Sequence, residues 1–213
     1  VDKGLAWASY KYTKGAISTF VAGRIGGVSI QRDGKMRNGL AADYSKGKSG
    51  KAHFLEGGGK AGFTANLGAG NTVSLGLGYE AKAPQAQAVF VSPEVNNYFV
   101  ANLKNEKVFS SELGYQFETS WLKANINAYY SHIGDATEWQ NFFYDDINSF
   151  SYVSMTGINK AYYGVEWGLN FKINSSFNVK AIGTVSDAKN LNNARVTYMN
   201  STSNELYEEL VLN

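Results

Sequence analysis

The sequence contains no cysteine, which excludes a disulfide framework, a cysteine-ligated metal and a thiol nucleophile. Its only two prolines, Pro84 and Pro93, stand close together. Because proline cannot donate a hydrogen bond to a sheet, this leaves the rest of the chain free to form strands. Charged residues make up 18% of the chain and the formal net charge is +2, with lysine and arginine scattered, so a nucleic-acid partner is not indicated.

Long hydrophobic runs are also missing, and the mean hydropathy is −0.29. No stretch approaches the roughly 18 to 20 apolar residues of a membrane-spanning helix. A membrane-spanning strand is not excluded, since it needs only about 9 to 11 residues of alternating character.

What the sequence does contain is alternation of apolar and polar residues. In residues 108–118, Phe109, Leu113, Tyr115 and Phe117 share one parity, and residues 122–130 repeat the pattern after a tight turn. This predicts a hairpin with one apolar and one polar face. Similar alternation occurs in residues 5–12, 60–67, 73–80, 163–173 and 177–186, while glycines obscure it in residues 17–30. The apolar face either packs on a second sheet or contacts lipid.

The predicted connections alternate in length along the chain. Short turns are predicted at residues 14–15, 68–71, 119–120 and 174–176, and long loops at 31–59, 83–106, 131–158 and from 187 onward. In an up-and-down antiparallel sheet all short turns share one end, which is the asymmetry of an outer-membrane barrel. The sequence therefore predicts an all-β fold, a transmembrane antiparallel up-and-down β-barrel, with about eight strands in a single segment covering residues 1–213.

Aromatic residues fall at two levels of the predicted strands. Phe117, Trp121, Phe171 and Phe177 lie near the short turns, and Tyr79, Tyr130 and Tyr163 lie near the long loops. Two such levels are typical of the aromatic girdles at the two membrane interfaces. This favours the lipid-facing interpretation over an aromatic-rich sandwich core.

Four short motifs stand at residues 102–107 (Asn-Leu-Lys-Asn-Glu-Lys), 111–115 (Ser-Glu-Leu-Gly-Tyr), 60–63 (Lys-Ala-Gly-Phe) and 163–166 (Tyr-Gly-Val-Glu). Together they resemble the barrels of TonB-dependent outer-membrane receptors of Bacteroidetes-type bacteria. Their order and spacing match from Leu5 to Asn190, although Lys82 stands where the family often has arginine.

The resemblance implies active transport of a nutrient across the outer membrane of a Gram-negative bacterium. It implies a barrel of about 22 strands closed by an N-terminal plug, which receives energy from TonB. The partners would be outer-membrane lipid and lipopolysaccharide, the rest of the barrel and plug, TonB through the plug, and a small-molecule or peptide substrate. The chain starts at Val1 without methionine and does not end in an amphipathic strand closed by an aromatic residue. We therefore expect a segment of a longer barrel, without plug domain or terminal strand.

Two sets of candidate site residues follow. The long loop 131–158 is rich in aromatic and acidic residues, which suit organic ligands; its substrate-contact candidates are Trp139, Phe142, Phe143, Tyr144, Asp145 and Asp146. Alternatively, these aromatics pack the loops against one another. The residues expected to face the lumen are Glu112, Gln116, Lys123, Asn125, Asn127, Glu166, Asn170 and Lys180.

Enzymatic activity is not expected. His53 and His132 lie in or beside different predicted loops, without a serine or aspartate at motif spacing, and no cofactor motif is present. Asp135, Asp145 and Asp146 lack a regular calcium-ligand spacing, so a solvated acidic loop is favoured. Two other classes remain open at this point: a small closed eight-stranded barrel with a structural or adhesive role, and a secreted β-sandwich binding module.

Overall fold

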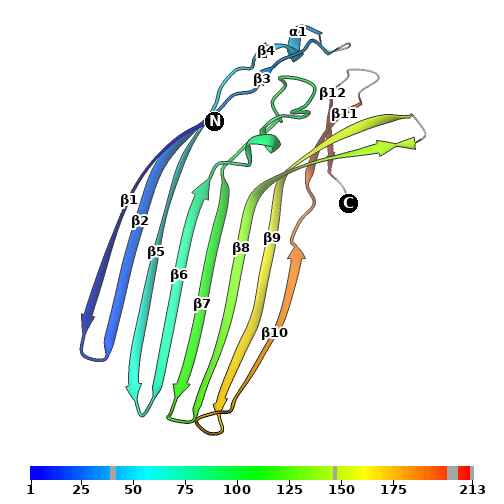
Figure 1. Ribbon diagram of the computed structural model, residues 1–213. Coiled ribbons are helices and arrows are strands. Elements are labelled where there is room, and N and C mark those ends of the chain that lie inside the picture. The colour runs from blue at the N-terminus through cyan, green and yellow to red at the C-terminus, as the bar shows by residue number, and fades with distance from the viewer. Residues whose placement is uncertain (39–41, 146–147, 201–205, 212–213) are drawn as a thin grey trace.

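The computed structural model describes residues 1–38, 42–145, 148–200 and 206–211. The chain forms one curved antiparallel wall of long strands (Figure 1). The wall strands, in order, are β1 (Asp2–Lys14), β2 (Ile17–Ile30), β5 (Ala52–Gly68), β6 (Asn71–Lys82), β7 (Glu106–Glu118), β8 (Leu122–Tyr144), β9 (Ser149–Lys172) and β10 (Asn178–Asn190). Each strand pairs with its sequence neighbour among these eight, so the topology is up-and-down.

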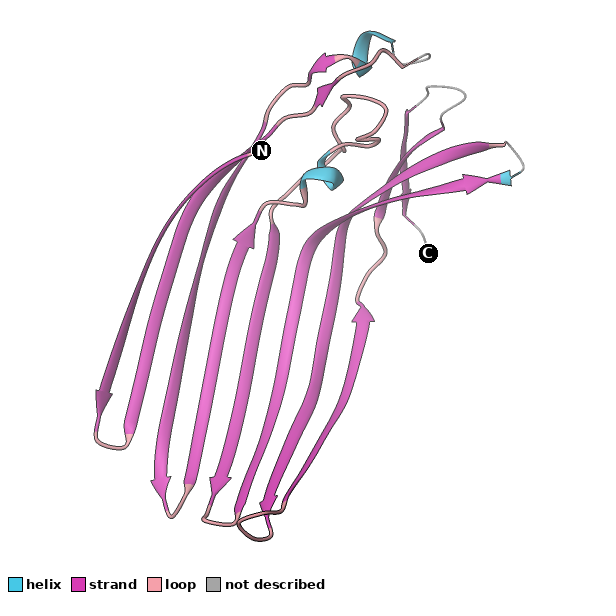
Figure 2. Ribbon diagram, in the orientation of Figure 1, coloured by secondary structure: helices cyan, strands magenta, loops and turns pink. Residues whose placement is uncertain are grey.

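The short turns all lie at one end of the wall, and the long connections all lie at the other (Figure 2). The long-connection end carries the small elements: β3 (Asp33–Gly34), α1 (Ala42–Ser45), β4 (Gly47–Lys48) and the 3-10 helix η2 (Ala86–Val89). It also carries β11 (Arg195–Asn200) and β12 (Leu206–Val211), which extend the sheet from the upper part of β9. No helix in the described part of the chain is long and apolar enough to cross a membrane.

The tight turns have a local physical cause. Gly15, Gly68 and Gly70 have φ between 57° and 84°, a region that side chains with a Cβ rarely adopt. At Gly70 an added Cβ would lie 1.8 Å from the carbonyl oxygen of Glu118, so the β5–β6 turn also needs glycine to pass close to β7.

The predicted turns and strand order are confirmed, but three long loops were predicted too long. Residues 131–158 are mostly not a loop: β8 and β9 continue through them as a hairpin, paired from Glu138–Met155 to Tyr144–Ser149. Likewise β5 begins at Ala52 rather than Lys60, and β10 extends to Asn190. Beyond it, β11 and β12 occupy much of what was expected to be loop.

The buried core lies at the long-connection end and not inside the wall. Val28 and Ile30 of β2 pack with Val89 and Phe90, which brings the connection between β6 and β7 onto the sheet. A second small cluster joins Val91 and Val100 within that connection. The wall itself leaves large apolar side chains exposed, Leu113 at 55% for example. Exposed apolar patches of this extent are rare on soluble proteins. The side of the wall that carries these side chains therefore requires an apolar cover.

Candidate functional site

The register sorts the wall into two chemically different faces. Residues directly opposite each other in a sheet project to the same side, so each cross-strand row belongs to one face. The apolar face includes these rows across β6 to β10: Leu77–Ser111–Tyr130–Tyr163–Asp187, Leu75–Leu113–Ala128–Val165–Val185, Val73–Tyr115–Ile126–Trp167–Gly183 and Phe117–Ala124–Leu169–Ala181.

Aromatic side chains border the apolar face at both ends. At the short-turn end Trp121 packs edge-on against Phe171, with ring centroids 5.3 Å apart. Toward the other end Phe109 and Tyr130 lie 6.5 Å apart, in the rows that also hold Tyr79 and Tyr163. The two levels expected from the sequence are therefore present on one face.

The opposite face is polar, and the register places on it all eight residues expected to face the lumen. Glu112 lies opposite Tyr129, Asn127 opposite Glu166, and Gln116 opposite Asn125. Lys123, Asn170 and Lys180 form one continuous row. Their common face agrees with the expectation, while the identity of that face as a lumen stays a prediction.

The connection between β6 and β7 folds over the polar face. Val28 and Phe54, directly paired across β2 and β5, belong to the parity of the polar face and contact the cluster around Val89. From the other side, the Trp139 indole N–H donates to the carbonyl oxygen of Val91 at 3.0 Å. The Ser154 hydroxyl, opposite Trp139 in the register, reaches the same oxygen at 3.5 Å. The wall thus holds this connection between β2–β5 and β8–β9.

Arg32 joins the connection between β6 and β7 to the connection between β2 and β5. Its guanidinium donates to the carbonyl oxygens of Ser45, Pro93 and Glu94 and to the side chain of Asn97, at 2.6 to 3.3 Å. Burial lowers the pKa of Arg32 below its usual value and nearby Asp33 opposes that effect. An arginine remains charged at neutral pH in either case, so these are charge-assisted bonds.

A groove of about 480 Å³ lies between η2 and the upper parts of β8 and β9. Its lining is mainly polar and carries both signs of charge. Lys160 pairs with Glu138, and Glu106 pairs with Lys82 at 3.3 Å. The lining also includes the amides of Gln85, Gln87 and Gln140 and the rings of Trp139 and Tyr162. Such a surface can bind an organic solute that exchanges hydrogen bonds and offers a flat apolar side.

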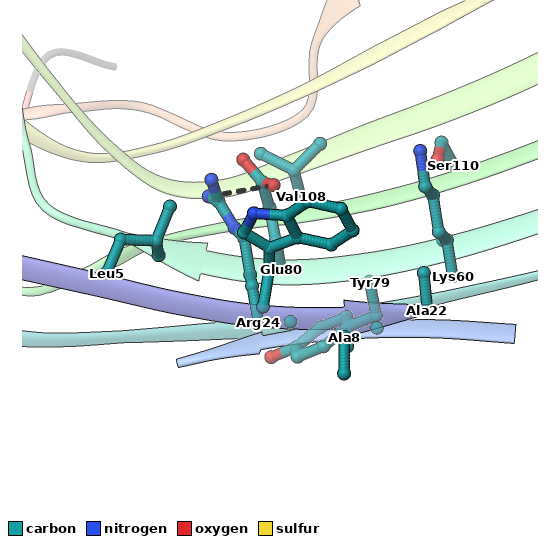
Figure 3. A pocket seen from close by; sticks show the side chains of 14 residues that line it. Leu5, Ala8, Ala22, Arg24, Lys60, Tyr79, Glu80, Val108 and Ser110 are labelled. Atoms are coloured by element: carbon teal, nitrogen blue, oxygen red, sulfur yellow. Dashed lines mark ion pairs between the residues drawn. The ribbon is translucent and has the colours of Figure 1, made fainter. Parts of the chain in front are cut away.

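A second hollow lies lower on the wall, toward the β1 edge (Figure 3). Arg24 and Glu80 form an ion pair of 2.9 Å here, and the register places both on the polar face. Lys60 and Ser110 project to the same side as this pair in Figure 3, while Tyr79 and Ala8 project to the opposite side. Arg24 and Glu80 offset each other, Lys60 adds a further positive charge to the lining, and Leu5, Trp7 and Val108 supply apolar walls.

Among the substrate-contact candidates, those that the structure describes do not gather in one place. Trp139 lines the groove, but it also stacks on Tyr152 at 6.3 Å and binds Val91, so it packs the connection as well. Phe143, with 48% of its surface exposed, and Asp145 lie near the hairpin tip. Phe142 and Tyr144 belong to β8, with side chains outside the described set, and Asp146 lies outside the described residues.

Sequence reasoning missed Arg32, Glu106, Glu138 and Lys160. Arg32 stands alone in a polar segment, and its four acceptors lie 13 to 65 residues away, so no local pattern marks it. Glu138 and Lys160 could have been found only if residues 131–158 had been recognised as a hairpin, because their pairing depends on its register.

No protein-family model matches the sequence, and no curated protein matches it. Among solved structures, the chain is similar to the copper transporter OprC, with a TM-score of 0.70 and 14% sequence identity. The similarity covers 92% of this chain and 32% of that one. At this identity the likeness concerns the fold, and it confirms the predicted all-β, up-and-down barrel segment. This chain spans about a third of the length of OprC.

Proposed function

We propose that the chain is part of the wall of an outer-membrane active transporter in a Gram-negative bacterium. The observation that carries the proposal is the separation of faces across β6 to β10. One face is apolar with aromatic side chains at two levels, and the other holds Glu112, Glu166, Lys123 and Lys180. Lipid would cover the first face and a water-filled lumen would contact the second, as in transmembrane barrels.

The finer identity we propose is a TonB-dependent receptor of Bacteroidetes type, a non-enzymatic protein. The motif resemblance around residues 102–115 and 163–166 supports it, and the likeness of fold to a transporter agrees with it. In that case the remaining strands, bringing the barrel to about 22, and the plug that contacts TonB would complete the protein.

The free edges of the wall support a larger barrel rather than a small closed one. Within the described residues, β1 pairs only with β2, and β10 pairs only with β9. A closed eight-stranded barrel would pair β1 with β10. A sandwich would place a second sheet over the apolar face, and the described strands form no such layer there.

For the substrate, we propose first contact at the groove between η2 and the β8–β9 hairpin. The groove lies at the long-connection end, which in an outer-membrane barrel faces the exterior. Copper, the cargo of OprC, is not carried over to this chain, because the groove offers amide, carboxylate and aromatic groups that suit an organic solute.

Cysteine labelling tests the lipid and lumen faces directly, because residues 1–213 contain no cysteine and any cysteine elsewhere in the protein can be replaced by serine. Asn127→Cys and Ile126→Cys place the label on adjacent residues of β8 with opposite facing. In outer membranes containing the full-length protein, a water-soluble maleimide should label the Asn127→Cys protein at least about tenfold faster. Comparable labelling of both would contradict the assignment of the faces and, with it, the proposed function.

A further inference from the structure

The hollow near the β1 edge is formed where two glycines stand in neighbouring rows of the polar face. One row reads Trp7–Arg24–Gly58–Glu80–Val108, and the next reads Ser9–Ala22–Lys60–Gly78–Ser110. Because Gly58 and Gly78 have no side chains, the backbone of β5 and β6 lies uncovered between longer neighbours. The resulting hollow of about 500 Å³ is large enough for a small organic molecule.

The first row holds an ion pair that reaches across Gly58. Arg24 Nη2 lies 2.9 Å from a carboxylate oxygen of Glu80, and β5 runs between the two strands that carry them. A Cβ at Gly58 would lie 2.7 Å from the Glu80 Cβ, so this position excludes larger residues. Arg24 Nε is buried and has no hydrogen-bond partner in the described part of the chain. The ion pair therefore occupies the carboxylate and leaves one guanidinium donor unused.

Lys60 is the cation of the hollow that no carboxylate neutralises. Its side chain is exposed, and it forms no ion pair with any described residue. The carboxylates of the row above have partners of their own: Glu56 pairs with Lys3 at 2.7 Å, and Glu106 pairs with Lys82 at 3.3 Å. Glu112 lies one row below and two strands away, about 12 Å from Lys60 between Cα atoms, which exceeds the roughly 8 Å screening length at physiological salt.

Two further side chains suit an anion that has a flat apolar part. Ser110 projects to the same side as Lys60 (Figure 3), and its hydroxyl lies beside the glycine floor, 2.8 Å from where a Cβ of Gly78 would be. Trp7, opposite Arg24 on β1, is 72% exposed although it belongs to the polar face. An exposed indole ring offers a surface on which a planar group can stack.

We propose that this hollow binds a small organic monoanion, a carboxylate carried on a flat apolar group. Lys60 and Ser110 donate to the carboxylate, and the flat group stacks on Trp7. Arg24, Lys60 and Glu80 together carry one net positive charge, which matches a carboxylate better than a phosphate monoester with its charge of about −2. An amine is disfavoured because Arg24 already occupies the carboxylate of Glu80.

The hollow borders the groove proposed for first contact. Val108 of the hollow lies opposite Ile133 of the groove in the register of β7 and β8. A solute that leaves the groove therefore reaches the hollow across one strand spacing of about 5 Å. The inference rests on the proposed function in one respect, because the polar face must contact water for such a solute to arrive.

The test uses the full-length protein in a non-ionic detergent, with 4-fluorobenzoate as the probe and fluorine NMR to measure its dissociation constant. The neutral probe 4-fluorobenzamide has nearly the same shape, so the ratio of the two constants reports the contribution of the cation. Lys60→Gln removes the ammonium group, and Trp7→Ala removes the ring. Lys180→Gln is the matched control, because it removes an exposed lysine from the polar face at the short-turn end of β10. Heat-modifiable gel mobility checks that each variant is assembled.

The parent protein and Lys180→Gln should bind 4-fluorobenzoate about fivefold more tightly than 4-fluorobenzamide, the upper range for one exposed ion pair. Lys60→Gln should lose this preference, and Trp7→Ala should bind both probes more weakly. Equal affinity of the parent for the two probes, an unchanged preference in Lys60→Gln, or undiminished binding by Trp7→Ala would overturn the inference. Maleimide labelling of Asn127→Cys and Ile126→Cys tests the proposed function separately, and its outcome does not depend on either probe.

Discussion

Arg32 donates a hydrogen bond of 2.7 Å to the side-chain oxygen of Asn97, a residue 65 positions further along the chain. Next to it, the Asn97 backbone N–H donates to the carbonyl oxygen of Tyr44 at 2.6 Å. These bonds fasten the β2–β5 connection to the β6–β7 connection. Arg32 alone supplies three hydrogen bonds between the two connections, to Pro93, Glu94 and Asn97.

Replacing Arg32 by alanine should release this attachment. Hydrogen bonds to a charged group each contribute about 1.5 to 3 kcal/mol, so a local loss of several kcal/mol is expected before any relaxation. Hydrogen–deuterium exchange of a peptide spanning residues 90–103 should accelerate in Arg32→Ala. The control Lys35→Ala breaks only the exposed pair with Asp33 and should leave that exchange unchanged. Unchanged exchange in Arg32→Ala would show that the apolar clusters alone hold the connection.

Charges on the apolar face should prevent assembly. Leu75 and Leu113 lie opposite each other in the middle of that face, and arginine at the middle of a bilayer costs about 2 to 4 kcal/mol. Leu75→Arg and Leu113→Arg should therefore lose heat-modifiable gel mobility. Asn125→Arg, on the polar face, should retain it. Equal mobility of all three variants would argue against lipid on the apolar face.

Gly183 should resist substitution because the Trp167 ring lies over it. A Cβ at Gly183 would come within 2.5 Å of two atoms of that ring, whereas at Gly76 the nearest atom, Glu112 Cβ, is 4.0 Å away. Gly183→Ala should lower the free energy of unfolding by about 1 kcal/mol or more, as overpacking does, and Gly76→Ala should not. Urea unfolding in detergent measures both, and equal midpoints would show that the ring moves aside freely.

Two substitutions of Trp139 can distinguish a role in packing from a role in ligand contact. Trp139→Phe removes the donor to Val91 but keeps a ring to stack on Tyr152, while Trp139→Ala removes both. If the ring serves ligand binding, Trp139→Phe should retain substrate binding that Trp139→Ala loses at equal surface expression. If it serves packing, both should speed exchange in residues 90–103. Undiminished binding by Trp139→Ala would move the search for the substrate site away from the groove.

The attachment of the β6–β7 connection to the β2–β5 connection should weaken at alkaline pH, where the Tyr98 phenol loses its proton. Burial, and secondarily Tyr44, raises the pKa of the Tyr98 phenol, and the two rings stack at 5.0 Å. The attached state therefore binds the phenol proton more tightly than the detached state does. The contribution of the Tyr98 phenol to the stability of the attached state is complete below about pH 10, the usual tyrosine pKa. It is lost as the pH rises through the raised pKa.

Fluorescence of Trp139, in a protein in which every other tryptophan is replaced by phenylalanine, would follow this detachment. Tyr98→Phe should reduce the alkaline change between pH 9 and 11. An identical pH profile in the phenylalanine variant would assign the change to other groups.

The wall was predictable because its strands between β6 and β10 have one apolar and one polar face. Between Leu122 and Tyr130, each residue contacts either the apolar or the polar side, so parity in the sequence reports facing directly. The same logic located the short turns and the strand order.

The β8–β9 hairpin was not predictable by that logic. Beyond Ile133 the two strands leave the wall (Figure 1): Trp139 contacts the β6–β7 connection, and β11 pairs with the edge of β9. Trp139 and Ser154 share a face although one is aromatic and the other a small polar residue. Where a strand does not have one apolar and one polar side, the alternation of apolar and polar residues disappears. The sequence of such a strand then resembles that of a loop. Glu56 hid the start of β5 in a similar way, as a carboxylate only 3% exposed that Lys3 of β1 pairs at 2.7 Å.

An irregularity around Asp135, in the pairing of β8 with β9, limits how the hairpin can change in length. The pairing shifts between Ile133 and Ala136 and shifts back between Ala136 and Glu138, so residue numbers on opposite strands sum to 293 both below and above it. Because the two shifts cancel, Trp139 projects to the same side of the sheet as the odd-numbered residues of β8 below the irregularity. One residue inserted into only one arm would turn that arm over relative to its partner. Changes in hairpin length should therefore occur as matched additions to both arms, or be confined to the tip.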